Sequence, residues 1–103
     1  VLLGMGEDGH TASLFPGRPL AAGADVLAVH AAPKPPPERV TLSAARLSRA
    51  RQVLFLVTGA DKRAAVTAWR AGADIPARAI SGNVQVLLDA EAAAEEPSIT
   101  GSR

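Results

Sequence analysis

The sequence predicts an α/β fold in which helices cover a mostly parallel sheet. Short apolar segments alternate along the 103 residues with segments of helical periodicity, and glycine or proline separates many of them. The strongest strand signal, Val-Leu-Phe-Leu-Val at residues 53–57, is apolar at every position. Because both faces of such a strand are apolar, it is expected to lie centrally in a parallel sheet.

The chain begins on a short strand that leads into a glycine-rich turn. Residues 1–3 are apolar and β-prone, and three glycines follow within the next six residues. Asp8 and His10 lie on this turn, at the strand end where open α/β sheets bind ligands. Residues 11–15 are expected to start a short helix that Pro16 stops.

Two strands and a helix are predicted next. Residues 25–32 are typical of a buried strand, and residues 38–42 of a short strand. The proline run of residues 33–37 lacks most amide donors and must be extended between them. Ser43 is a favourable N-cap for a helix over residues 44–50.

The last third repeats the alternation. Asp61 is expected to cap a helix over residues 62–71, which Gly72 ends. Residues 83–88 are typical of another strand, and residues 89–96 of a short helix.

Composition narrows the class of partner. Hydrophobic residues at 48% and charged residues at 20% are typical of a soluble globular protein, and no apolar run is long enough to span a membrane. A net charge of +1, with one Trp and two Phe, gives no case for nucleic acid. The absence of cysteine and of a secretory leader favours a cytoplasmic location. A small polar metabolite is therefore expected.

The first glycines also satisfy the pattern Gly-x-Gly-x-x-Gly of dinucleotide sites, but their context does not fit. That fingerprint needs a full helix after the third glycine, and an acid at the end of a second strand. Here Pro16 and Pro19 interrupt the helix, and Asp25 precedes its apolar run. A dinucleotide-binding module is the weaker interpretation.

Four blocks of sequence carry more specific motifs. In order they are Gly-Met-Gly-Glu-Asp-Gly-His-Thr-Ala-Ser-Leu-Phe-Pro-Gly (4–17), Pro-Lys-Pro-Pro-Pro-Glu-Arg-Val-Thr-Leu (33–42), Thr-Gly-Ala-Asp-Lys (58–62) and Val-Leu-Leu-Asp (86–89). Together they resemble the 6-phosphogluconolactonases. The resemblance implies a Rossmann-like layered fold and a carboxylic ester hydrolase of the pentose phosphate pathway. Its substrate would be the sugar-phosphate lactone 6-phospho-D-glucono-1,5-lactone, and its product 6-phospho-D-gluconate.

Members of that family are longer than this chain. The resemblance implies that residues 1–97 form the C-terminal part of a larger lactonase-like domain, and we expect residues 98–103 to be a disordered tail. The first residue is not Met and lies inside an apolar strand. The family's Ser-Gly-Gly type phosphate loop has no counterpart here.

Lactone hydrolysis needs a base that activates water and donors that stabilise the oxyanion. Imidazole changes charge near neutral pH, so His10 is the candidate base, and the resemblance implies the same role. Asp8 matches the acid that partners it; from spacing alone, Asp8 could equally cap the short helix predicted after it. The turn amides, with Gly6 and Gly9 as candidate substrate-binding residues, could face the oxyanion.

A phosphorylated substrate also needs cations. Lys62 lies in the first turn of a predicted helix, where the helix dipole disfavours a cation unless an anion binds there. The resemblance likewise implies a phosphate contact for Lys62. Arg39 and Lys34 match charged positions of the family, and Arg39 is the preferred of the two. Arg39 could instead pair with Glu38 or Asp25 on the surface.

Two alternatives stay open. The related glucosamine-6-phosphate deaminases share the glycine turn, but Phe15 stands where they have a glutamate used in acid–base chemistry. A non-catalytic sugar-phosphate or dinucleotide-binding fragment is the other. His30, within an apolar strand, is expected to be a packed or edge histidine. Two histidines twenty positions apart, without cysteine, lack the usual ligand spacing, so we expect neither metal nor cofactor. The oligomeric state is left open.

Overall fold

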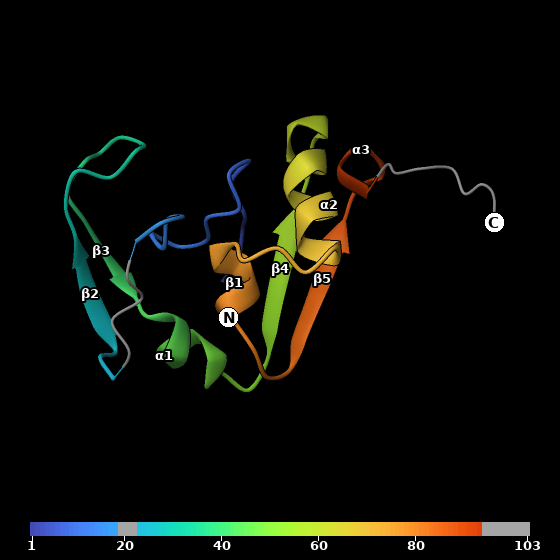
Figure 1. Ribbon diagram of the computed structural model, residues 1–103. Coiled ribbons are helices and arrows are strands. Elements are labelled where there is room, and N and C mark those ends of the chain that lie inside the picture. The colour runs from blue at the N-terminus through green and yellow to red at the C-terminus, as the bar shows by residue number, and fades with distance from the viewer. Residues whose placement is uncertain (19–22, 94–103) are drawn as a thin grey trace.

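Three parallel strands form the main sheet of the computed structural model, which describes residues 1–18 and 23–93. The strands are β1 (Leu2–Leu3), β4 (Val53–Val57) and β5 (Val84–Leu88), and β4 lies between the other two. Because they run parallel, all three end at the same edge of the sheet (Figure 1). The predicted α/β class, the parallel sheet and the central strand are confirmed.

Helices bury one face of this sheet. α2 (Arg63–Arg70) packs on it, and Trp69 meets the fully buried Phe55 edge-on, with ring centroids 4.8 Å apart. α3 (Ala90–Ala93) lies beside α2 (Figure 1). No helix within the described residues is long and apolar enough to cross a bilayer.

The opposite face of the sheet is open. Leu2, Leu56 and Leu87 lie on it and are 64%, 49% and 54% exposed. The apolar pattern of β4 predicted a strand covered on both faces, but only one face is covered. The prediction and the structure differ because an apolar pattern shows that a face can be buried, whereas tertiary packing determines whether another element lies against it.

A second, antiparallel sheet stands to one side of the main one (Figure 1). It consists of β2 (Val26–Val29) and β3 (Arg39–Leu42). The prediction of a buried strand over residues 25–32 is wrong, because β2 is a sheet edge and its residues alternate between exposed and half-buried. Val26 and Val40 are exposed on the outer face of this pair.

α1 (Ala44–Ser48) connects the antiparallel pair to β4. The Ser43 hydroxyl accepts a hydrogen bond from the Arg46 amide at 3.0 Å. The predicted N-cap is confirmed, and such a cap contributes about 1 kcal/mol. The helix ends at Ser48, two residues before the predicted end.

The start of α2 differs from the prediction. A 3₁₀ turn over Ala60–Lys62 precedes the helix, and Asp61 makes no capping hydrogen bond to it. The Gly59 carbonyl accepts from the Lys62 amide at 3.1 Å, so backbone closes this turn. Gly72, at a φ of +88°, follows α2 as predicted.

Asp89 caps α3 instead of forming its first turn. Its Oδ1 accepts from the Ala92 amide at 2.8 Å. The same carboxylate accepts from the Gly59 amide at 3.1 Å, which ties the end of β5 to the end of β4. The remainder of the helix predicted over residues 89–96, and the predicted tail, lie outside the described residues beyond Ala93.

Candidate functional site

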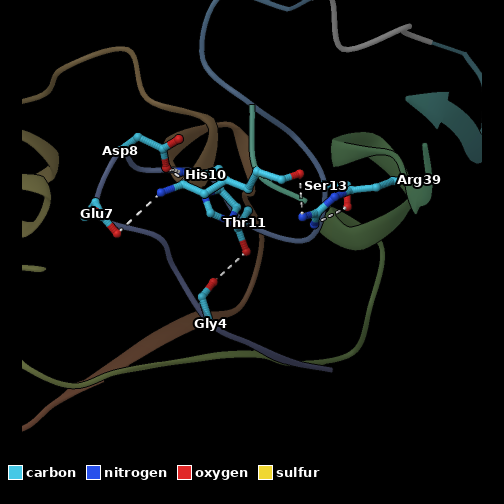
Figure 2. A network of polar contacts seen from close by, with 8 residues as sticks. Gly4, Glu7, Asp8, His10, Thr11, Ser13 and Arg39 are labelled. Carbon is cyan, nitrogen blue, oxygen red and sulfur yellow. Dashed lines mark hydrogen bonds and ion pairs between the residues drawn. The ribbon is translucent and has the colours of Figure 1, made fainter. Parts of the chain in front are cut away.

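Internal hydrogen bonds fold the loop after β1 back on itself. The Gly6 amide donates to the His10 carbonyl at 2.8 Å, and the Gly9 amide donates to the Gly6 carbonyl at 2.9 Å. The buried Thr11 hydroxyl donates to the Gly4 carbonyl at 2.8 Å (Figure 2). These bonds hold His10 close to the end of β1.

The helix predicted over residues 11–15 does not form. Thr11 and Leu14 make an isolated antiparallel bridge, and the Leu14 amide donates to the Thr11 carbonyl at 2.9 Å. The buried Thr41 hydroxyl accepts from the Ser13 amide at 3.1 Å, which anchors the turn to β3. Because there is no helix at this point, Asp8 has none to cap.

Asp8 instead pairs with His10. Asp8 Oδ1 accepts from the His10 amide at 3.0 Å and lies 2.6 Å from His10 Nδ1 (Figure 2). The two side chains are 30% and 19% exposed, respectively. A carboxylate oxygen beside Nδ1 favours the tautomer with its N–H on that nitrogen. Nε2 is then left with a lone pair that can take a proton.

The pKa of Asp8 lies below its ordinary value. Partial burial alone would raise the pKa, but hydrogen bonds from the backbone and ring of His10, together with the charge of that ring, outweigh it. Asp8 is therefore a carboxylate at neutral pH and can orient the ring or stabilise an imidazolium.

Replacing Asp8 with asparagine should remove a pH-dependent part of the stability. A carboxyl whose pKa is lowered in the folded state stabilises it above the pKa of the unfolded chain, and this contribution is lost as the pH falls through the folded value. The free energy of unfolding should therefore differ between parent and Asp8→Asn at about pH 5, and much less at about pH 2. Urea unfolding at both pH values measures this. The exposed Asp74→Asn is the control, and equal pH dependence in both variants would contradict the prediction.

Phe15 supports the His10 ring. Their ring centroids are 4.7 Å apart with the planes tilted by 32°, and Phe15 is 1% exposed. Gly6 contacts the same ring, because a Cβ at that position would overlap Cε1 and Nδ1 of His10. The imidazole is thus confined by Asp8, Phe15 and the backbone of Gly6.

At Gly9 the loop packs against residues 75–79, which follow α2. Its φ is +87°, and a Cβ there would lie 2.8 Å from Cβ of Ile75. The Gly9 carbonyl accepts from the Ala77 amide at 3.1 Å, within a 3₁₀ turn over Pro76–Ala79. A side chain at Gly9 would push the loop off this support.

The amide N–H groups of Gly6 and Gly9 already donate hydrogen bonds to carbonyls of the same loop, those of His10 and Gly6. The structure therefore gives these two glycines a steric role, in admitting the His10 ring and the Ile75 side chain. Their contact with substrate stays a prediction.

The three predicted cations are placed differently. Lys34 reaches the glycine loop, where Nζ lies 3.6 Å from Oε1 of Glu7. Arg39 lies over Phe15, with its guanidinium carbon 5.3 Å from the ring centroid. The ammonium group of Lys62 has no hydrogen bond or ion pair with any residue that the structure describes. Their contacts with phosphate stay predictions.

The surface ion pairs considered for Arg39 do not form. Oε1 of Glu38 lies 2.6 Å from Nδ1 of His30, and Oδ1 of Asp25 accepts from Arg49 at 2.8 Å. His30 is 74% exposed, so of the two predicted positions, packed or at a sheet edge, the structure shows the edge. It directly follows β2, whose residues are exposed or half-buried.

Two open hollows adjoin the loop. One, of about 310 Å³, is lined by Gly4, Met5, Gly6, His10, Thr11 and Ala12. The other, of about 460 Å³, lies between Phe15 and β2. His10 therefore faces space that a small molecule can enter. Among the described residues, no three His, Cys, Asp or Glu side chains gather as a metal site would require.

Sequence reasoning missed the supporting roles of Phe15 and Ile75. Phe15 was notable only for replacing an acid, and Ile75 lies between the predicted helix over residues 62–71 and the predicted strand over residues 83–88. The available signal was a single one, a large apolar residue directly before Pro16 in a polar loop. It indicates burial but not the partner.

The family of this chain follows from comparison with known proteins. Residues 1–88 match the family described as glucosamine-6-phosphate isomerases/6-phosphogluconolactonase. The chain belongs to this family. The 6-phosphogluconolactonase of Mycobacterium tuberculosis is 47% identical over 104 residues, which cover 94% of this chain and 42% of the relative. The chain thus spans less than half the length of the relatives it matches.

Solved structures of the family agree with the fold. The 6-phosphogluconolactonase from Trypanosoma brucei is 39% identical with a TM-score of 0.74, covering 89% of this chain and 40% of that one. A monomeric glucosamine-6-phosphate deaminase is 28% identical with a TM-score of 0.69, covering 89% of this chain and 45% of that one. Both branches of the family therefore share this half of the fold.

Proposed function

We propose that the domain to which this chain contributes hydrolyses 6-phospho-D-glucono-1,5-lactone to 6-phospho-D-gluconate, with His10 as general base. The observation that carries the proposal is the Asp8–His10 pair, 2.6 Å apart at the carboxyl end of β1 and beside an open hollow. Membership of a family that contains the lactonases supports the choice of substrate.

In the proposed mechanism, the Asp8 carboxylate holds the Nδ1–H of His10, and Nε2 takes a proton from water. The water oxygen attacks the lactone carbonyl and forms a tetrahedral oxyanion. Collapse of this intermediate breaks the bond to the ring oxygen, which receives the proton back from His10. The ionised Asp8 stabilises the imidazolium between the two transfers. Gly6 lines the hollow beside these groups, and Gly9 packs the loop against Ile75.

Lys62 is the proposed phosphate anchor. It follows β4, so it lies at the same edge of the parallel sheet as the loop that carries His10. Its ammonium is unpaired within residues 1–18 and 23–93, unlike that of Lys34. An unpaired cation beside a substrate site is suited to a phosphate group.

Replacing Lys62 with methionine should weaken substrate binding. A hydrogen bond to a charged group contributes about 1.5–3 kcal/mol, so KM should rise by roughly 10-fold or more, with a smaller change in kcat. Steady-state kinetics on the complete domain measures this. Arg63→Met is the matched control, because Arg63 is next in sequence and bonds to Glu91 instead. Equal KM values for the two variants would contradict the role of Lys62.

The rest of the domain is proposed to cover the open face of the sheet. Leu2, Leu56 and Leu87 are exposed there, and the matched relatives have more than twice the length of this chain. Burying such leucines is favourable by about 25 cal/mol per Å² of apolar surface. We therefore propose residues 1–97 as the C-terminal part of a larger lactonase-like domain, as the resemblance implied.

Deamination of glucosamine 6-phosphate is the second candidate. The similarity to the monomeric deaminase favours it, but Phe15 opposes it. Where the deaminases carry a glutamate, this chain buries a phenyl ring against His10 and has no proton to transfer. The lactonase needs no acid at that position.

The test uses a chimera in which residues 1–93 replace the matching part of the M. tuberculosis relative. Proton release from the lactone, above its spontaneous rate, and ammonia release from glucosamine 6-phosphate are measured in parallel. Lactone hydrolysis without ammonia release is expected. A folded chimera that releases ammonia, or accelerates neither reaction, would overturn the proposal. The relative's remaining part alone is the control.

A further inference from the structure

One side chain joins the proline run of residues 33–37 to the loop that carries His10. Arg39 donates to three consecutive carbonyls of that run and also lies over Phe15. We propose that Arg39 is a positioning residue, which fixes the His10 ring through Phe15. This rests on the proposed role of His10 as base.

The proline run depends on donors from outside itself. Pro35, Pro36 and Pro37 have no N–H, so they cannot pair with a neighbouring strand as donors. Arg39 supplies hydrogen bonds to the carbonyls of Lys34 at 3.1 Å, Pro35 at 2.7 Å and Pro36 at 3.0 Å. The Ala32 amide supplies the one to Pro37, at 2.9 Å. A planar fork of five N–H groups suits such a set of carbonyls.

The other side of Arg39 faces the turn after His10. Its Nη1 donates to the Ser13 hydroxyl at 3.4 Å (Figure 2), and its guanidinium carbon is 5.3 Å from the Phe15 centroid. The Phe15 centroid in turn is 4.7 Å from that of His10. Because Phe15 is 1% exposed, it cannot move without disturbing this stack. Arg39 therefore acts on His10 through one intervening ring.

The hydrogen bonds of Arg39 also fix the position of Lys34. Arg39 Nη2 holds the Lys34 carbonyl, while the Lys34 ammonium lies 3.6 Å from Glu7 on the glycine loop. The proline run is thus attached to the site at two points. Nε, Nη1 and Nη2 of Arg39 all have acceptors within the chain, whereas the ammonium of Lys62 has no partner among the residues that the structure describes. This engagement favours a positioning role for Arg39 over the predicted phosphate contact.

NMR of the ligand-free chain tests the proposal, using the ring-proton signals of His10. In the parent, the ring current of Phe15, whose centroid is 4.7 Å from that of His10, should displace these signals. Arg39→Lys keeps the positive charge but loses the planar fork. Its His10 signals should lose much of that displacement and move towards those of a Phe15→Leu reference. Arg49→Lys is the matched control, since Arg49 bonds to Asp25 on the surface, and it should leave the His10 signals unchanged.

His10 signals that are identical in parent and folded Arg39→Lys would overturn the proposal; methyl signals of the buried Val53 and Val57 report folding. If the variant does not fold, the parent alone decides. The Arg39 Nε–H should show a nuclear Overhauser contact with the Phe15 ring and should not respond to inorganic phosphate. A missing contact, or a saturable shift with phosphate, would overturn it. Neither arm measures hydrolysis, so this proposal and the proposed lactonase activity can fail separately.

Discussion

Replacement of His10 by alanine is expected to lower kcat/KM for lactone hydrolysis by about 10²–10⁴-fold in the complete domain, the range typical of a general base. Asp8 would keep its charge but lose the ring that it holds at 2.6 Å. Because His10 is partly exposed beside an open hollow, the change should affect the reaction far more than the fold. Proton release during hydrolysis, corrected for the spontaneous rate, measures the effect.

The chain provides a closely matched control in His30. His30 also lies 2.6 Å from a carboxylate, that of Glu38, but the pair is on the exposed edge of the antiparallel sheet. His30→Ala should therefore leave kcat/KM close to that of the parent. Equal losses in the two variants would indicate an unspecific effect of removing a histidine. An active His10→Ala would mean that another group activates the water.

Introducing a single methyl group at Gly6 should disable the same site without removing any functional group. A Cβ at Gly6 would overlap Cε1 and Nδ1 of His10, so the ring must leave its position against Asp8 and Phe15. A misplacement of about 1 Å in a catalytic group can reduce the rate by about 10²-fold. We expect a loss of this size in kcat for Gly6→Ala.

Gly4→Ala is the control for this substitution. Gly4 lies on the same loop, has no heavy atom within 4 Å of an added Cβ, and like Gly6 does not have a positive φ. Its kcat should stay near that of the parent. The double variant Gly6→Ala/His10→Ala should lose no more activity than His10→Ala, because both changes act on one side chain. Full activity in Gly6→Ala would contradict the geometry of the His10 ring.

Local pattern was sufficient for much of the fold. Five consecutive apolar residues marked β4 as the central strand, and the positions of Ser43 and Gly72 marked the start of α1 and the end of α2. These features depend on residues close in sequence, whose propensities and hydrogen bonds act within one or two turns. The pairing of Asp8 with His10 belongs to the same class, because they lie two positions apart on one tight turn.

Only the tertiary structure decided what these elements lie against. β2 is exposed because it lies at a sheet edge. His30 pairs with Glu38, Arg49 pairs with Asp25, and Gly9 packs against Ile75, and none of these partners are neighbours in sequence. The same holds for Arg39, for which the sequence predicted a phosphate contact or a surface ion pair, and which the fold places over Phe15 with carbonyls as partners. Sequence pattern determines which groups need a partner, whereas the partner is chosen by packing, since burial and hydrogen bonding depend on distances that only the folded chain sets.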